Sequence, residues 1–247
     1  MNILKILKTS LENTVENASF LLINDLMLAY STLVSFGVFV TFFLIGLSFS
    51  YYFIGPNNSV YLPITLFIIF LGICSSLLFL FPAFGTYLNF TYESIRIKRR
   101  YNLMEELEHF DKNLIPYIIT GILEYGPILF LGLVFFLVWI IFQKNILLGV
   151  FFLFLFLITS IVYCSFTFLV YPAVVIDKKK IMSAFSISIA LGRKYFIQAI
   201  ISLILLNALK IMGMLLVFVY PIFFYYIYVP IYSYFVIYYY KAASSRL

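Results

Sequence analysis

Long, uninterrupted runs of apolar residues are the feature that most constrains this chain. Several runs exceed the roughly 20 residues that a helix needs to cross a bilayer, and they carry very few charges. Over its 247 residues the chain is 64% apolar and 11% charged, whereas soluble domains are roughly 45–50% apolar and about 25% charged. The composition is that of a membrane protein, and we expect no soluble catalytic domain.

The length of the apolar runs predicts an all-α, polytopic membrane protein with six transmembrane helices. The predicted spans are Leu28–Ile54, Leu62–Phe90, Ile115–Phe142, Ile146–Ile176, Phe196–Val219 and Ile222–Tyr240. Short turns at 55–61, 143–145 and 220–221 join them in pairs. The sequence therefore predicts one membrane domain of three hairpins, at 28–90, 115–176 and 196–240, with a tail at 241–247.

A polar segment with helical periodicity precedes each hairpin, at 1–27, 91–114 and 177–195. In the first segment Leu4, Leu11 and Val15 recur on one face while Lys5 and Glu12 take another. In the third segment, Asp177 is the expected N-cap and Gly192 the expected stop. We expect three cytoplasmic amphipathic helices at the membrane interface, with their apolar faces in the lipid or against the bundle.

The distribution of basic residues predicts the orientation. Of the 16 Lys and Arg residues, 14 fall in the predicted polar segments and the two ends. Because cytoplasmic loops carry the excess of Lys and Arg, we expect both termini in the cytoplasm of a cell or inner membrane. The net charge of +6 then describes a surface that meets anionic lipid headgroups, and it gives no reason to expect nucleic acid. We also expect no cleaved signal peptide, since the first apolar run is too long for one.

A weak internal repeat supports the three-unit interpretation. The motifs "FPAF" at 81–84 and "YPAV" at 171–174 are each expected to end the second helix of a hairpin, because proline interrupts helical hydrogen bonding. The third unit departs from this pattern, since its "YPIF" at 220–223 falls in the outer turn.

The stretch "VYPAVVIDKKKIMSAFSISIALGRKYF", residues 170 to 196, resembles a pattern of uncharacterised six-helix archaeal and bacterial membrane protein families. It is also similar to the membrane domain that accompanies some glycerophosphodiester phosphodiesterases. The resemblance implies a six-helix fold and no settled activity. The phosphodiesterase domain is absent from this chain, so its chemistry is not expected here.

No motif for catalysis, a metal or a cofactor is present. The chain has one histidine, His109, and two distant cysteines, Cys74 and Cys164, which are expected to be small buried residues. No GxSxG, HExxH or phosphate-binding glycine loop occurs. The acidic residues Glu105, Glu106, Glu108 and Asp111 are expected to form a solvated helix face. We therefore expect no enzyme and no cofactor.

Glu124 and Lys210 are the charged residues that fall clearly within predicted spans, and such groups are functional candidates by default. They could pair if the third and fifth spans are neighbours, with Asn207 as a further partner and Tyr125 beside the glutamate. Pro127 cannot donate to the carbonyl of Leu123, so a free acceptor is expected close by. A working intramembrane site and a structural ion pair both remain open.

The favoured interpretation is a non-enzymatic docking, scaffolding or accessory subunit of a membrane assembly. Its interfacial helices and lipid-facing aromatic residues would contact the bilayer and a membrane protein partner or a second copy. The alternative is a small transporter or channel that uses the candidate polar site of Glu124, Lys210, Asn207, Tyr125 and Pro127. An apolar stripe facing a partner favours the first interpretation, and a wet cavity that reaches Glu124 favours the second.

Overall fold

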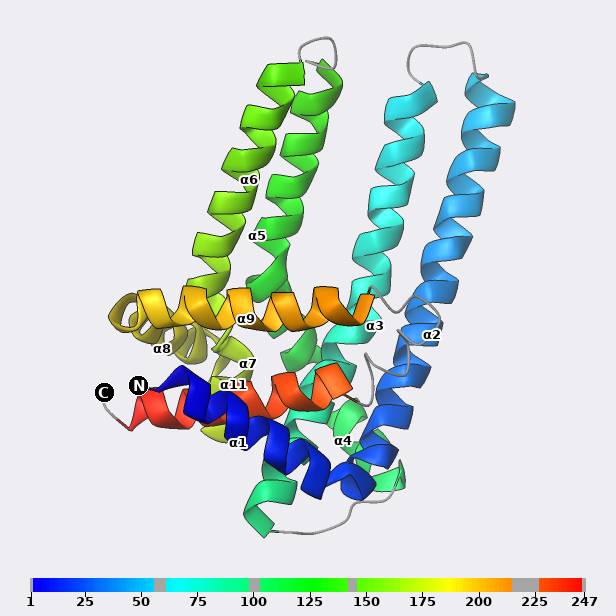
Figure 1. The fold of residues 1–247 in the computed structure, drawn as a ribbon. Helices are drawn as coiled ribbons and strands as arrows, with labels where there is room; N and C mark the ends of the chain where they lie inside the picture. The colour runs from blue at the N-terminus through cyan, green and yellow to red at the C-terminus, as the bar shows by residue number, and fades with distance from the viewer. Residues whose placement is uncertain (1, 56–60, 98–102, 142–145, 215–226, 246–247) are drawn as a thin grey trace.

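The computed structural model describes residues 2–55, 61–97, 103–141, 146–214 and 227–245, and all regular elements in these ranges are helical. The all-α class is thus confirmed. Two long hairpins stand side by side in Figure 1. One pairs α2 (Ala18–Phe49), which ends in a π-helical turn at Ser50–Ile54, with α3 (Tyr61–Ile97). The other pairs α5 (Leu114–Ile141) with α6 (Ile146–Thr167).

Within the described residues, four helical segments are long and apolar enough to cross a bilayer. They are Leu28–Ile54, Ile64–Arg96, Leu114–Phe135 and Leu147–Ile176. Large apolar side chains are exposed along these hairpins, among them Phe36, Leu44, Phe67, Phe130 and Phe154. Such a surface requires an apolar solvent, so the chain is a multi-pass membrane protein in contact with lipid. These segments correspond to the first four predicted spans.

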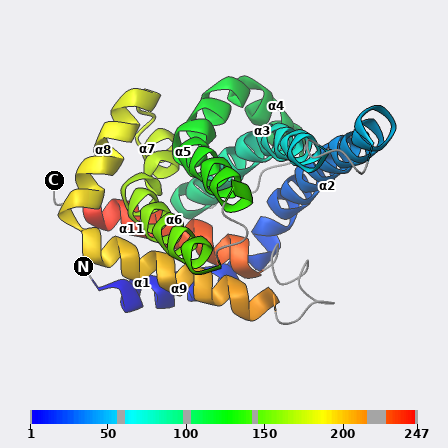
Figure 2. The same cartoon turned by 90° about the horizontal axis from the view of Figure 1, so that it is seen from above.

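The described residues do not show the predicted third hairpin. The fifth span corresponds to α9 (Phe196–Met214), which lies across the axes of α5 and α6 in Figures 1 and 2. It follows α8 (Ile181–Lys194) after a bend of 98°, and the two together make a fifth span only if they are counted as one broken span. The sixth span is represented by α11 (Val229–Ser244), and the predicted turn at 220–221 lies outside the described residues.

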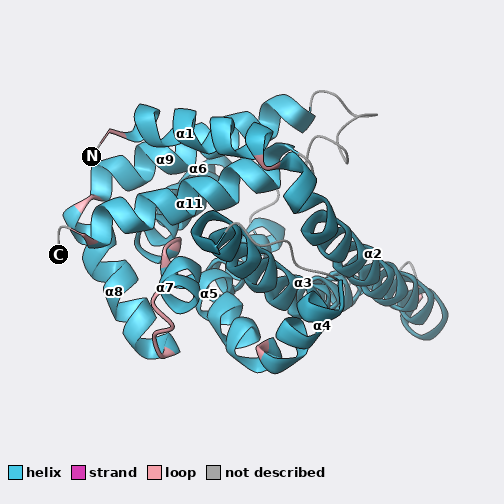
Figure 3. Ribbon diagram, turned by 90° about the horizontal axis from the view of Figure 1, so that it is seen from below, coloured by secondary structure: helices cyan, strands magenta, loops and turns pink. Residues whose placement is uncertain are grey.

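The helix α11 is a core element. Eleven of its residues are buried, and Tyr234, Phe235, Tyr239 and Tyr240 are almost completely enclosed. It lies beside α1 (Ile3–Glu16) and crosses the lower part of the bundle (Figure 3). The tyrosine-rich sequence therefore serves packing. Tyr240 also donates a hydrogen bond of 2.7 Å to the Asp177 carboxylate, which gives one buried hydroxyl its partner.

The three predicted amphipathic segments each contain a separate helix: α1, α4 (Leu103–Lys112) and α8. In α1, the side with Ser10 and Thr14 is buried, whereas Leu4 and Val15 are exposed. The apolar stripe of α1 thus lies next to its packed face and stays open. In α8, Ala184 and Ser188 are buried against the bundle.

Several predicted helix ends are wrong. Pro82 lies inside α3, which continues to Ile97, so "FPAF" ends no helix. A break does occur near "YPAV", where α6 ends at Thr167 and the short α7 (Val170–Ile176) begins. Asp177 follows α7 and does not cap α8, whose N-cap is Lys180.

Gly192 lies inside α8 and does not end it. It is buried against the backbone of α6, where a Cβ atom would come within 2.7 Å of the Phe166 Cα and of the Ser165 carbonyl oxygen. The glycine therefore permits close helix packing at this point, because any side chain would meet the backbone of the neighbouring helix. Ser188, one turn earlier, donates a 2.7 Å hydrogen bond to the carbonyl of Phe166.

Candidate functional site

The segment around Glu124 is a continuous helix with a locally altered hydrogen-bond pattern. Pro127 lies inside α5 and has no N–H to donate to the carbonyl of Leu123. The hydroxyl of Tyr163 on α6 donates to that carbonyl instead. Three residues before Glu124, Gly121 lies directly under the Phe81 ring of α3, where a Cβ atom would overlap the ring. These two contacts fix α5 between α3 and α6, and thereby fix the position of Glu124.

Glu124 borders a cavity of about 450 Å³ between the two hairpins and the crossing helices α9 and α11. The polar residues of its wall include Thr32, Glu124, Tyr125, Asn207, Lys210 and Tyr232. Aromatic rings, among them Phe84, Phe168 and Tyr228, supply much of the remaining wall. The volume falls within the range of about 300–1,000 Å³ that is typical of small-molecule sites.

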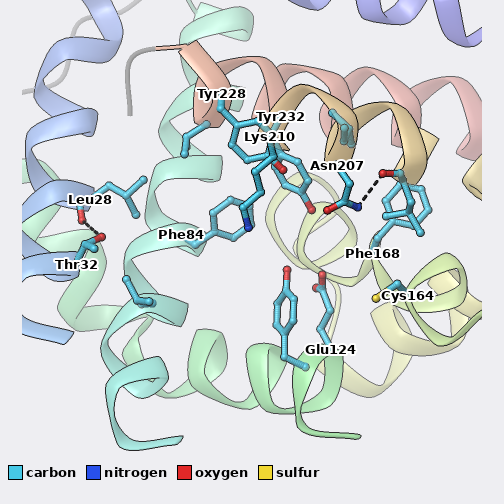
Figure 4. Close-up of a pocket in the computed structure, with 15 residues that line it drawn as sticks. Leu28, Thr32, Phe84, Glu124, Cys164, Phe168, Asn207, Lys210, Tyr228 and Tyr232 are labelled. Atoms are coloured by element: carbon cyan, nitrogen blue, oxygen red, sulfur yellow. Dashed lines mark hydrogen bonds between the residues drawn. The ribbon is translucent and has the colours of Figure 1, made fainter. Parts of the chain in front are cut away.

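The Glu124 side chain is only 4% exposed, and its Oε2 atom has no hydrogen-bond partner. Figure 4 shows Glu124 entering the pocket from one side and Lys210 from the opposite side. A buried carboxyl oxygen without a donor is energetically unfavourable unless something else satisfies it. This atom is therefore available to a bound molecule or to water.

The structure brings most of the predicted polar site together. Glu124, Tyr125, Asn207 and Lys210 all line the same pocket, whereas Pro127 does not. Between described residues, the ion pairs are Lys8–Glu12 and Lys112–Glu108, so Glu124 and Lys210 share a pocket without being paired. The Asn207 amide donates to the Leu203 carbonyl of its own helix at 2.8 Å. The predicted pairing of Glu124 with Lys210 is thus not seen between these two described residues.

Several lining residues were not identified from the sequence. Cys164 reaches the pocket from α6, Phe84 from α3, and Tyr228 and Tyr232 from the first turns of α11. A further tyrosine, Tyr171, stands near this level, and its hydroxyl lies 3.1 Å from the Phe81 carbonyl and 2.9 Å from the Tyr117 carbonyl. The prolines Pro82, Pro127 and Pro172 were visible in the sequence, and the helix break that occurs beside Pro172, before α7, is of the kind that often borders functional sites.

A second polar cluster lies outside the candidate spans, and it corrects the predicted solvated face of α4. Glu106 is 1% exposed and points inward, whereas the apolar residues Met104 and Leu107 of the same helix are exposed. Asp25 on α2 is also buried, at 3% exposure. His109 is half-buried with its ring against Phe90, and its Nδ1 atom has no partner. The helix thus presents charged groups to the protein interior.

No group of three or more His, Cys, Asp or Glu side chains is arranged for a metal ion in the described parts of the chain.

Comparisons with known proteins identify no relative: no family model, no curated protein and no solved structure matches this chain. The resemblance of residues 170–196 to six-helix membrane families therefore stays an expectation. The pocket lined by Glu124 and Lys210 is therefore the feature of the described residues that bears on function.

Proposed function

We propose that this protein is a membrane transporter or channel-like carrier whose pocket around Glu124 and Lys210 binds a small amphipathic molecule. The observation that supports the proposal is that Glu124 and Lys210 line one cavity of about 450 Å³ without forming an ion pair with each other. Intramembrane charges usually pair or mark a substrate path. Here they are placed so that a substrate would complete the pairing.

The lining favours a zwitterionic substrate with an apolar or aromatic body. A carboxylate on one wall complements a cationic group, and the ammonium of Lys210 on the other wall complements an anionic group. The aromatic rings of Phe84, Tyr228 and Tyr232 would cover the rest of the molecule. Free amino acids with large apolar side chains have this combination of charge and shape.

The native cysteines allow a direct test of binding. Cys164 lines the pocket, whereas Cys74 lies on α3 and is not among its lining residues. In a Cys74→Ser background, a small thiol reagent should modify Cys164 in membrane vesicles, because the pocket of about 450 Å³ has room for it. A panel of apolar amino acids should slow this modification, and Glu124→Gln or Lys210→Met should remove the protection.

The matched control is Glu108→Gln, which changes an exposed carboxylate on α4 and should leave the protection intact. Unreactive Cys164 in folded protein would contradict a wet pocket. Protection that persists in Glu124→Gln with Lys210→Met would contradict the proposed role of the two charges.

A docking or accessory role is the second candidate, and the exposed stripe of α1 favours it. Leu4, Leu11 and Val15 are 70%, 42% and 78% exposed, beside a face that already packs on α11. With both termini in the cytoplasm, as the basic residues predict, this stripe would lie in the interfacial region and contact lipid or a membrane protein partner. Crosslinking from Val15→Cys in native membranes would distinguish a protein neighbour from lipid alone.

A further inference from the structure

Two buried carboxyl groups meet where α2, α3 and α4 pack together. Asp25 lies one turn before the first candidate span, and Glu106 lies in the middle of α4. Their exposed fractions are 3% and 1%. Within the described residues, neither carboxyl group has a basic side chain at ion-pair distance. Asp25 Oδ1 and both carboxyl oxygens of Glu106 have no hydrogen-bond partner.

Two phenol hydroxyls belong to the same cluster. Tyr87 of α3 is 2% exposed, Tyr234 of α11 is fully buried, and neither hydroxyl has a partner. Tyr87 lies within electrostatic reach of Asp25, Glu106 and Tyr234. Buried polar groups in folded proteins are nearly always satisfied. Several unsatisfied oxygens converging from four helices therefore indicate that a positively charged species belongs between them.

Among the described residues of α2, α3 and α5, the helices packed against α4, the basic side chain is Arg96, which is exposed and lies at ion-pair distance from neither carboxyl group. The acidic groups on these helices are Asp25, Glu93 and Glu124, and their phenols are Tyr30, Tyr61, Tyr87, Tyr92, Tyr117 and Tyr125. The titratable groups of α4 itself are Glu105, Glu106, Glu108, His109, Asp111 and Lys112. Lys112 is paired with the exposed Glu108 at 2.6 Å. Burial lowers the pKa of His109, Glu93 opposes this effect, and Lys178 and Lys112 add to it, so His109 is a weaker source of positive charge than a free histidine.

Two like charges this deeply buried cannot both persist without a cation, because desolvation and mutual repulsion each disfavour the charged forms. The smallest cation that fits between close oxygens is a proton, and it needs no ligand cage. A carboxyl group that keeps its proton can donate a hydrogen bond to the other carboxylate, while a phenol hydroxyl donates a second. One proton thus satisfies several of the unpaired atoms together.

We propose that Asp25, Glu106 and Tyr87 form a proton-binding site that holds α4 against α2. With the proton bound, the two carboxyl groups attract each other through a shared hydrogen bond. When the proton leaves, two negative charges face each other in a site of low dielectric, and α4 separates from α2 so that water reaches them. Because α4 is followed almost directly by α5, which begins at Leu114, this movement acts on the helix that carries Glu124.

The titration range supports this site. Burial raises the pKa of Asp25 to about 7. Burial, and after it the negative charge of Asp25, raises the pKa of Glu106 to about 8. Carboxyl groups in the unfolded chain titrate near pH 4. Between this pH and the raised pKa values, the folded protein therefore binds more protons than the unfolded chain. The contact between α2 and α4 is therefore strongest below pH 5 and weakens as the pH rises toward 8.

Infrared spectroscopy of the whole protein in nanodiscs tests the proton directly. A protonated carboxyl band should be present at pH 6 in the wild type, should decline between pH 6 and 9, and should lose its titrating part in Asp25→Asn with Glu106→Gln. In Asp25→Asn alone, the remaining Glu106 should titrate at lower pH, because the negative charge of Asp25 is gone. Asp111→Asn, an exposed change on the same helix, should leave the titration unaltered.

Hydrogen exchange of α4 provides the conformational readout. Protection of residues 103–112 should fall by tenfold or more between pH 6 and 9 after correction for intrinsic exchange, and it should stay constant in the double variant. A titrating band that survives in the double variant would overturn the proposal. The proposal also fails if millimolar Ca²⁺, Mg²⁺ or Na⁺ restores protection at pH 9 in the wild type only, because the site would then hold a metal ion.

Discussion

The hydroxyl of Tyr163 donates a hydrogen bond to the main-chain carbonyl of Leu123, forty residues earlier in the chain. This carbonyl is the one that Pro127 leaves without its usual donor in α5. The bond satisfies a main-chain acceptor within a span, where water is scarce. It also joins the two helices of a hairpin immediately beside Glu124.

Loss of this hydroxyl should therefore destabilise the hairpin. We expect Tyr163→Phe to lower the free energy of unfolding by about 1–3 kcal/mol, because a buried acceptor loses its partner. Unfolding monitored by circular dichroism in mixed micelles measures this change. Pro127→Ala restores the N–H of residue 127, so the double variant should recover part of the loss. Equal losses in the single and double variants would show that the Tyr163 bond does not replace the missing helical bond.

Glu124 and Lys210 should behave as independent residues in the empty protein. Since they form no ion pair with each other, a double-mutant cycle with Glu124→Gln and Lys210→Met should give a coupling energy within about 0.5 kcal/mol of zero. A structural buried pair would instead cost about 3–5 kcal/mol when one partner is removed. Thermal unfolding in nanodiscs without added substrate measures the cycle, and strong coupling would favour the structural pair.

Gly192 should tolerate no side chain. We expect Gly192→Ala to destabilise the protein by roughly 1–3 kcal/mol, because the added methyl group meets the backbone of α6 and overpacks a tight contact. Gly37 on α2 is the matched control, since a Cβ atom there meets nothing within 4 Å. Gly37→Ala should stabilise its helix by up to about 1 kcal/mol. Similar melting temperatures for the two variants would argue against the close approach of α8 and α6.

The orientation predicted from the basic residues can be tested by cysteine labelling. In a background without Cys74 and Cys164, an impermeant maleimide should modify Ser183→Cys only after the cytoplasmic side is opened, since this exposed residue of α8 lies in a basic segment. Ser59→Cys, in the predicted outer turn, should react in intact cells. Efficient labelling of Ser183→Cys in sealed cells would reverse the topology.

The spans that could be predicted from the sequence are those for which composition and environment agree. Leu28–Ile54 was predicted with the bounds that the structure supports. Its side chains are mostly apolar along its whole length and largely face lipid, so the composition alone locates the span. The crossing helices α9 and α11 are also rich in apolar residues, but they pack across the bundle. A hydropathy criterion counts apolar residues and does not distinguish burial in lipid from burial in protein.

The pocket around Glu124 and the cluster around Glu106 also differ in how far the sequence predicts them. Glu124 could be found because a charge within an apolar run is conspicuous, and the pocket does place it with Lys210 and Asn207. Glu106 lies among other acidic residues on a short helix, and its periodicity suggested a solvated face. Its burial depends on the packing of α4 against α2 and α3, and the residue pattern of α4 alone does not show which face that packing covers.

The contact between α1 and α11 has a consequence for biosynthesis. Residues 17–228 lie between these two helices, yet Ile3, Ile6 and Leu7 pack on the same cluster as Phe235 and Tyr239. While the intervening chain is being synthesised and inserted, α1 lacks this partner and can shelter its apolar residues only at the lipid surface. Maturation of the protein therefore ends with a late docking step, and a nascent chain arrested before Val229 should keep α1 sensitive to protease.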